Sequence, residues 1–161
     1  MTATFTRIFA GHPYRMAAAG ALVLAGLALA WYLGSPLFLT TRADEALPLA
    51  AEAKVLTRGE LGFIDNLHNG KGEVRLIQVG SKRFLRFESV AITNAPDIHI
   101  YLSKDTGGKY VEANSLYLGP LKATNGSFNY EIPASADLAP YKSVVAWCRN
   151  FSTLITWADL R

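Results

Sequence analysis

"DIHIYL", residues 97–102, alternates between apolar side chains and polar or aromatic ones. In an extended chain, successive side chains point to opposite faces, so every second residue shares a face. One face of this stretch would hold Ile98, Ile100 and Leu102, and the other would hold Asp97, His99 and Tyr101. A period of two residues is typical of a β-strand rather than of a helix. The stretch therefore predicts a strand that packs its apolar face on a core.

Similar short strands and turns surround this stretch on both sides. The strand-like runs are "EVRLIQV" (73–79), "RFLRFESVAI" (83–92), "YVEANSLYLG" (110–119), "FNYEI" (128–132) and "YKSVVAWCRNFSTLITWADL" (141–160). Asn-Gly pairs within "HNGKG" (68–72) and "TNGS" (124–127) predict tight turns between strands. About eight short strands at this spacing are typical of an antiparallel sandwich or barrel. Residues 54–161 are therefore predicted to form an all-β domain, either an antiparallel β-sandwich or a barrel-like fold.

A long apolar segment precedes this domain. Every residue from 16 to 41 is uncharged. A helix of this length would extend about 39 Å, whereas the hydrocarbon core of a bilayer is about 30 Å thick. Pro36 would end the regular helix, and Trp31 and Tyr32 lie near its far end, where aromatic rings favour the membrane interface. Residues 16–39 are therefore predicted to be one transmembrane helix that contacts the lipid bilayer.

A cleaved signal peptide is the alternative interpretation of the same segment. The tripeptide "ALA" at 28–30 matches a cleavage site with two small residues. However, the bulky Trp31 would follow the cut, and the apolar run continues to Leu39. These two features favour an uncleaved anchor. Both interpretations export the C-terminal part of the chain.

The charges that flank the apolar segment predict its orientation. Arg7 and Arg15 precede it without an acidic residue nearby, while Arg42 is soon followed by two acidic residues. Positive charges favour the cytoplasmic side of a membrane. We therefore expect a single-pass protein of the cell membrane, with residues 1–15 in the cytoplasm. A stalk, residues 40–53, and the β-domain would lie outside.

The balance of charge excludes one class of partner. The chain has 16 Lys and Arg residues against 13 Asp and Glu residues. Two of the basic residues, Arg7 and Arg15, lie before the apolar segment, so the remainder of the chain is nearly neutral. No basic stripe of the kind that binds nucleic acid is present in the sequence. A nucleic-acid partner is therefore not expected.

Cys148 is the only cysteine, and it lies beside Trp147 in a run that predicts a strand. A single cysteine cannot form an internal disulfide. It could be a redox-reactive thiol shielded by Trp147, half of an intermolecular disulfide, or a small apolar side chain in the core. Free cysteine is among the most buried residue types. The sequence therefore favours the core role.

The sequence contains none of several motifs for metal, haem or hydrolytic chemistry. No histidine follows Cys148, and the methionines, Met1 and Met16, precede the domain, which argues against a blue-copper site. There is no C-x-x-C-H haem motif, no paired-histidine zinc motif and no G-x-S-x-G nucleophile turn. We therefore predict no metal site, no cofactor and no catalytic residue.

The polar face of the opening stretch is a candidate contact surface. Side chains at positions i and i+2 of a strand lie about 7 Å apart, so one ligand could touch Asp97, His99 and Tyr101. The simpler interpretation is a strand face that is exposed to solvent.

Four segments in a characteristic order suggest a family. They are "GELGFIDNLHNGKGEVRLI" (59–77), "APDIHIYLS" (95–103), "LGPLKATNGSFNYEIP" (118–133) and "YKSVVAWCRNFSTLITWADL" (141–160). Together they resemble the DM-thirteen domain family, also called the electron-transfer DM domain, over about residues 50–160. The most specific parts are the Pro-Asp-x-His-x-Tyr-Leu-Ser segment and the pair Trp147-Cys148. "PLFLTTRADEALP" (36–48) resembles bacterial members with an N-terminal anchor, whereas Ala95 stands where a glycine is frequent.

The resemblance implies an all-β domain that is exported or membrane-associated. In animals and plants such domains often accompany DOMON domains and cytochrome-type membrane reductases, and this association has suggested a redox role for the cysteine, here Cys148. The first hypothesis is therefore a membrane-anchored extracytoplasmic electron-transfer module with another protein as its redox partner. The second is a non-catalytic binding module that meets a ligand or a surface protein through the face of Asp97, His99 and Tyr101. In that case Cys148 would be a core residue.

Overall fold

The computed structural model describes residues 13–35, 39–47 and 53–161. The chain forms two compact units, Met1–Phe38 and Leu39–Arg161. Most of the predicted cytoplasmic segment lies outside the described residues, as do Pro36 in the predicted anchor and Pro48 in the predicted stalk.

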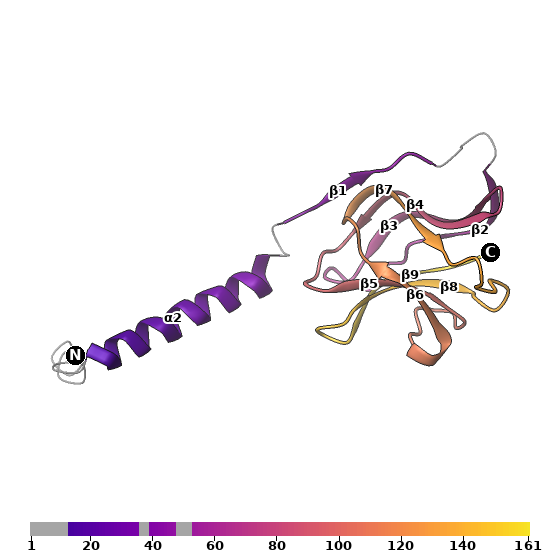
Figure 1. The fold of residues 1–161 in the computed structure, drawn as a ribbon. Coiled ribbons are helices and arrows are strands. Elements are labelled where there is room, and N and C mark those ends of the chain that lie inside the picture. Colours follow the sequence, from indigo (N-terminus) through magenta and orange to yellow (C-terminus); the bar gives the residue numbers. More distant parts are fainter. Residues whose placement is uncertain (1–12, 36–38, 48–52) are drawn as a thin grey trace. The chain divides into compact units, whose positions relative to one another are not determined.

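The first unit contains helix α2 (Pro13–Gly34), which is built almost entirely from apolar residues (Figure 1). Proline suits the first position of a helix, because its fixed φ matches the first turn and its missing N–H would have no partner there. No side chain of the helix is buried, and its length and hydropathy are those of a membrane span. A signal sequence has the same properties, so the helix is an anchor or a signal sequence.

The second unit contains two β-sheets (Figure 1). The five-stranded sheet has the order β1 (Arg42–Asp44), β7 (Asn125–Ile132), β4 (Lys82–Ile92), β3 (Gly70–Val79) and β2 (Lys54–Glu60). The four-stranded sheet has the order β6 (Ser115–Pro120), β5 (Ile98–Ser103), β8 (Ser143–Cys148) and β9 (Thr153–Asp159). All the pairings described are antiparallel except that of β1 with β7, which is parallel. The predicted sandwich-like, mostly β fold after a single apolar helix is confirmed.

The core lies between the two sheets, because alternation along each strand directs every second side chain inward. Its fully buried members include Val74, Leu85, Phe87 and Phe128 from the first sheet and Ile100, Leu102 and Cys148 from the second. The rings of Phe87 and Phe128 stack with their centroids 4.9 Å apart. Burying one large apolar side chain contributes about 1.5–3 kcal/mol, so this shared layer holds the sheets together.

The two sheets also join directly along one edge. The backbone N–H of Arg58 in β2 donates to the carbonyl of Arg161, and the N–H of Arg161 donates back, at 3.0 and 2.9 Å. The N–H of Gly62 donates to the carbonyl of Trp157 at 2.7 Å. A Cβ at Gly59 would collide with the carbonyl oxygen of Asp159, so only glycine permits this approach. The sandwich is therefore closed on one side in the manner of a barrel.

Residues of the predicted stalk take part in the five-stranded sheet. Strand β1 lies within residues 40–53, and its residues pair with β7 from Arg42 opposite Asn125 to Asp44 opposite Ser127. Three side-chain hydrogen bonds between Thr41 and Thr124 extend the attachment. The N–H of Thr41 donates to Oγ1 of Thr124 at 2.9 Å, the N–H of Thr124 donates to Oγ1 of Thr41 at 3.0 Å, and Oγ1 of Thr124 donates to the carbonyl of Thr41 at 3.0 Å. A three-residue edge strand carries too little pattern to be distinguished from a linker by sequence.

The two Asn-Gly pairs do not form the predicted tight turns. Asn125 and Gly126 begin strand β7, and Gly126 has a φ of +106° where a Cβ would meet the carbonyl oxygen of Ala43 in β1. The glycine here allows close approach of a neighbouring strand instead of a chain reversal. Gly70 likewise begins strand β3, and Asn69 forms an isolated bridge with Phe63 across a longer loop.

Candidate functional site

The four-stranded sheet has an outer face, directed away from the core, that carries several aromatic residues. The register of the sheet determines which of them meet. Tyr101 in β5 lies opposite Tyr117 in β6 and Val145 in β8, and His99 lies opposite Trp147. Because these positions alternate with core residues along each strand, their side chains share the outer face. Three strands that are separate in sequence thus build one surface.

Asp97, His99 and Tyr117 form a chain of hydrogen bonds on this face. The Nε2 atom of His99 lies 2.7 Å from Oδ1 of Asp97, and its Nδ1 atom lies 2.9 Å from the hydroxyl of Tyr117. An ionised carboxylate only accepts hydrogen bonds, so Nε2 carries the proton. In the neutral imidazole Nδ1 is then an acceptor, and the Tyr117 hydroxyl donates to it. Asp97 thereby fixes which nitrogen of His99 is the base.

Tyr101 has a different partner, although it neighbours Tyr117. Its hydroxyl oxygen accepts a hydrogen bond from Nε of Arg149 at 2.7 Å. The guanidinium carbon lies 4.6 Å from the ring centroid of Tyr117 and 5.7 Å from that of Tyr101, in the range of cation–π contacts. The hydrogen bond to Tyr101 raises the pKa of Arg149. The backbone N–H of Arg149 also donates to the carbonyl of Asp97 at 2.9 Å, which holds these two segments together.

Four rings of the outer face contact one another in series, and we call them the aromatic array: Tyr117, Tyr101, Tyr110 and Trp147. The centroid distances along this series are 5.3, 4.8 and 4.6 Å. Such spacings are those of favourable aromatic pairs. Burial, followed by the interaction with the Tyr101 hydroxyl, raises the pKa of Tyr110 to about 12. Tyr110 is therefore a neutral phenol at physiological pH.

Tyr110 reaches the array from the loop between β5 and β6. Gly108 in this loop has a φ of +75° and is buried against Leu154 and Trp157 of β9, where a side chain would not fit. The hydroxyl of Ser103 donates to the carbonyl of Lys109 at 3.1 Å. These contacts close the loop over the sheet and position Tyr110 on the outer face.

The predicted contact residues Asp97, His99 and Tyr101 do lie on one side of the sheet. Asp97 and His99 are hydrogen-bonded to each other, whereas Tyr101 bonds to Arg149 instead. His99 is 8% exposed and Tyr101 is 3% exposed, so the strand is covered on both faces and is not a solvated surface. Tyr117 is 44% exposed and is the part of the array that a partner can reach most directly.

Cys148, the last residue of β8, lies on the core face of the same sheet. Its side chain is fully buried in the core between the sheets and is a free thiol. Its neighbours across the strands are Ile98 in β5 and Thr153 in β9. Trp147 precedes it in the chain but stacks on Tyr110 at the outer face. The thiol and the aromatic array therefore lie on opposite faces of the four-stranded sheet.

Three residues of the outer face were not among the sequence candidates: Tyr110, Tyr117 and Arg149. Tyr110 lies in a loop, so no strand pattern indicates its direction. Tyr117 lies in a strand-like run, but its pairing with Tyr101 depends on the order of strands in the sheet. The available signal was composition, since seven of the aromatic residues fall between 99 and 147 near a histidine and an arginine, without a spacing that joins them.

No group of three His, Cys, Asp or Glu side chains that could hold a metal ion occurs among the described residues. The outer face instead combines easily oxidised rings with one base. A phenol hydrogen-bonded to an imidazole can release its proton at the moment when its ring loses an electron. The same rings and the exposed Arg149 could also pack against a bound molecule. These are the two kinds of chemistry that the arrangement supports.

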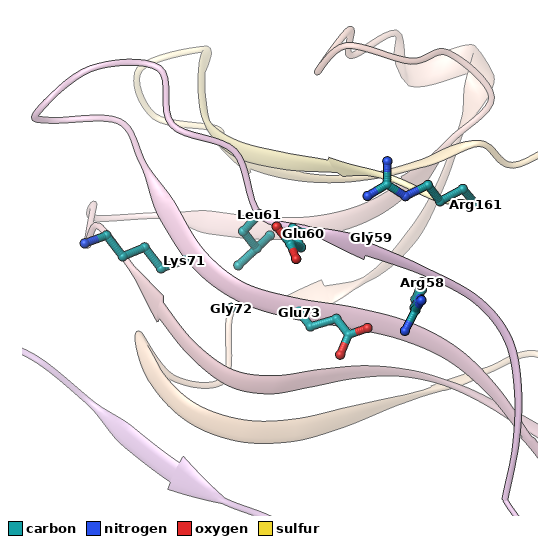
Figure 2. Close-up of a pocket in the computed structure, with 8 residues that line it drawn as sticks. All are labelled: Arg58, Gly59, Glu60, Leu61, Lys71, Gly72, Glu73 and Arg161. Atoms are coloured by element: carbon teal, nitrogen blue, oxygen red, sulfur yellow. The ribbon is translucent and has the colours of Figure 1, made fainter.

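A charged groove of about 610 Å³ lies elsewhere, along β2, β3 and the C-terminal residue (Figure 2). It is lined by Arg58, Gly59, Glu60, Leu61, Lys71, Gly72, Glu73 and Arg161. Glu73 is already paired with Nε of Arg75 at 2.8 Å. Figure 2 shows the cationic and anionic side chains distributed along the groove instead of converging on one point. The groove therefore gives no defined ligand chemistry.

Comparison with known proteins gives one match. The sequence model of the family described as "Electron transfer DM13" matches residues 62–160. None of the curated proteins and none of the solved structures compared with the chain matches it. The matched range contains strands β3 to β9, and with them the aromatic array and Cys148. Because the match spans more than half of the chain, the chain belongs to the electron transfer DM13 family, the DM-thirteen family that its motifs resemble.

Proposed function

We propose that this protein is a membrane-anchored, extracytoplasmic electron-transfer domain. The observation that carries the proposal is the family match, because the family is named for electron transfer and the matched residues include the whole aromatic array. Four rings in contact provide short steps along which an electron can pass. The exposed edge of Tyr117 is a place where a redox partner, most simply another membrane or exported protein, can approach.

The location rests on helix α2. Its exposed apolar side chains need a bilayer around them, and residues 16–39 provide the contact with lipid in this proposal. Arg7 and Arg15 before the helix favour a cytoplasmic N-terminus. The β-domain would then work outside the cytoplasm, at the cell membrane.

Cys148 is the candidate redox residue that the family resemblance indicates, with Trp147 as its neighbour in the chain. Thiol exchange requires a thiolate that a partner can reach, and the full burial of Cys148 argues against direct exchange. We expect a thiol reagent to leave the folded full-length chain unlabelled at neutral pH and to label it once denaturant is added. Rapid labelling of the folded chain would make Cys148 the redox centre.

The electron-transfer function is tested in cells that produce the protein naturally. Deletion of its gene is expected to lower the rate at which intact cells reduce ferricyanide, an acceptor that does not cross the membrane. The full-length chain supplied from a plasmid should restore the rate, and a chain without residues 54–161 should not. An unchanged rate in the deletion strain would contradict the proposed function.

A surface binding module is the second candidate function. It is favoured by a pocket of about 270 Å³ next to the outer face, whose lining includes Asn94, Asp97 and Lys122. A carboxylate, an amide and an ammonium group in one pocket fit a small polar ligand better than a redox partner. If Lys122→Ala abolished the physiological activity while Tyr117→Phe and Cys148→Ala left it intact, binding would be the function.

A further inference from the structure

We propose that Tyr117, His99 and Asp97 form a proton-coupled one-electron site, in which Tyr117 is the group that is oxidised. The inference rests on the proposed electron-transfer function and assigns the residues that would perform it. It also moves the redox centre from the buried Cys148 to the outer face of the same sheet. The geometry that leads to it is the chain of hydrogen bonds from the Tyr117 hydroxyl through His99 to Asp97.

A phenol loses an electron at an accessible potential only if its proton leaves at the same time. The oxidised phenol is a strong acid, so a base in hydrogen-bond contact lowers the free energy of the product. The Tyr117 hydroxyl lies 2.9 Å from Nδ1 of His99, within the 2.6–3.2 Å reach of a general base. Asp97, 2.7 Å from Nε2, stabilises the imidazolium that results.

Oxidation of Tyr117 by a partner moves one electron and one proton. One electron leaves the Tyr117 ring for a high-potential metal centre of a partner protein, which is reduced by one electron. The O–H bond of Tyr117 breaks, and an N–H bond forms at Nδ1 of His99. The Nε2–H bond of His99 stays intact and donates to Asp97. When a donor returns one electron to Tyr117, the proton moves back from Nδ1 to the phenoxyl oxygen.

Three other tyrosines of the β-domain, Tyr101, Tyr110 and Tyr130, have partners of a different kind. The Tyr101 hydroxyl accepts from Arg149, and a guanidinium has no acceptor for a proton. The hydroxyl of Tyr130, in the core, donates to the carbonyl of Pro120 at 2.9 Å, and a backbone carbonyl is not a base of useful strength. The ring of Tyr110 contacts the ring of Tyr101, and a second phenol is not a base of useful strength either. Tyr117 alone among these four couples a phenol to an imidazole.

Exposure and ring contact support the same assignment. Tyr117 is 44% exposed, so an oxidant can approach it, while the base beside it is 8% exposed and shielded from exchange with water. The ring of Tyr117 is the first of the aromatic array and lies 5.3 Å from Tyr101. A hole formed at Tyr117 can therefore pass toward Trp147, or an electron can return to Tyr117 by the same series of rings.

The test is photo-oxidation of the full-length chain in detergent micelles. A ruthenium tris-bipyridine complex with persulfate as its electron acceptor supplies a one-electron oxidant on illumination. Electron paramagnetic resonance is expected to show a tyrosyl radical, and its formation should slow in D₂O because a proton moves with the electron. Absence of a tyrosyl radical, or equal rates in the two solvents, would overturn the proposal.

Substitutions test which residues form the radical site. Tyr117→Phe keeps the ring and should abolish the radical, whereas Tyr101→Phe, the register partner with no base, should retain it. His99→Gln should slow radical formation by about 10²-fold, the lower range for loss of a general base, and added imidazole should restore part of the rate to His99→Gly. A radical that persists in Tyr117→Phe would overturn the assignment. Circular dichroism should show that each variant is folded.

The outcome for this site is separable from that for the proposed function. If gene deletion lowers ferricyanide reduction but Tyr117→Phe restores the rate as fully as the unaltered chain, electron transfer stands and the Tyr117 site is wrong. If the radical forms at Tyr117 but deletion changes nothing, the site chemistry stands and the proposed function is wrong.

Discussion

Cys148 and Trp147 are neighbours in the chain, but their side chains lie on opposite faces of strand β8 and meet different surroundings. Trp147 joins the aromatic array, while Cys148 is surrounded by the core of the sandwich. Adjacency in sequence therefore says little about contact within a strand, where successive side chains diverge. Cys148 therefore contributes to the stability of the fold as a small apolar group.

This role predicts an unusual order of stabilities for two substitutions. Cys148→Ser changes the size very little but places a hydroxyl in a fully buried apolar site, which costs about 1–3 kcal/mol without a partner. Cys148→Ala removes the sulfur and leaves only a small cavity. Urea unfolding of both variants should therefore show the alanine chain to be more stable than the serine chain. Equal stability of Cys148→Ser and the unaltered chain would show that the site is polar.

Arg86 is a buried cation paired with Glu88, and unfolding at different pH values tests how much this pair stabilises the fold. Its side chain is 8% exposed and donates to Glu88 through Nε at 2.6 Å and to Asn129 through Nη1 at 3.0 Å. The hydrogen bond from Arg86 is the largest cause of the lowered pKa of Glu88. The pKa of Glu88 in the folded chain is below its value in the unfolded chain. The pair with Arg86 therefore stabilises the fold at pH values above the unfolded pKa, and this contribution is lost as the pH falls through the folded pKa.

Glu88→Gln should therefore destabilise the fold by about 2 kcal/mol at neutral pH, the scale of a hydrogen bond between charged groups. The difference from the unaltered chain should shrink as the pH falls below the ordinary range of a glutamate. Glu131→Gln is the matched control, because Glu131 pairs with Lys82 on the surface and such a pair contributes little. Thermal unfolding across pH measures both. A difference in stability between Glu88→Gln and the unaltered chain that stays constant with pH would contradict this account.

At the scale of elements, strand β1 depends on a glycine in its neighbour. Gly126 in β7 has a φ of +106°, and a Cβ there would press on the carbonyl of Ala43. Gly126→Ala should therefore cost more than backbone strain alone and should separate β1 from the sheet. Gly80→Ala is the control, because its φ is +58° and no atom lies within 4 Å of the added Cβ. It should cost about 1–2 kcal/mol, the strain of a left-handed residue.

Hydrogen exchange distinguishes the two glycine variants beyond their stability. The N–H of Glu45, which donates to the carbonyl of Ser127 at 2.7 Å, should lose protection in Gly126→Ala and keep it in Gly80→Ala. Retained protection of Glu45 in both variants would show that β1 tolerates the larger residue.

Some contacts of the candidate site are set within one strand and can be predicted from the sequence, whereas others depend on how the strands pair. Alternation along residues 97–102 correctly separates a core face from a second face, because that information lies within one strand. The pairing of Tyr101 with Tyr117 depends on the strand order of the sheet, which no single strand contains. For this reason half of the candidate site was found from the sequence, and the half supplied by β6, the preceding loop and Arg149 was not.

The whole chain combines an apolar helix with a polar, charge-balanced β-domain. These two parts are suited to different environments, a bilayer and water. Among the described residues, Leu24 and Leu27 of α2 are 68% and 63% exposed. A bilayer would remove this apolar surface from water, which is the physical reason to expect an anchor. A signal sequence would achieve the same only until cleavage.

A retained anchor and a cleaved signal sequence would leave the β-domain in different cell fractions. The intact chain, 17.5 kDa, should remain in the membrane fraction after alkaline washing, and protease added outside the cytoplasm should digest its β-domain. Leu24→Arg with Leu27→Arg places two charges in mid-span, at about 2.5–3.5 kcal/mol each, and should release the chain from the membrane. Leu56→Arg, at a partly exposed position of β2, is the control that should stay. A shorter soluble product that begins after Ala30 would instead identify α2 as a cleaved signal sequence, which preserves export of the domain but removes the membrane from its function.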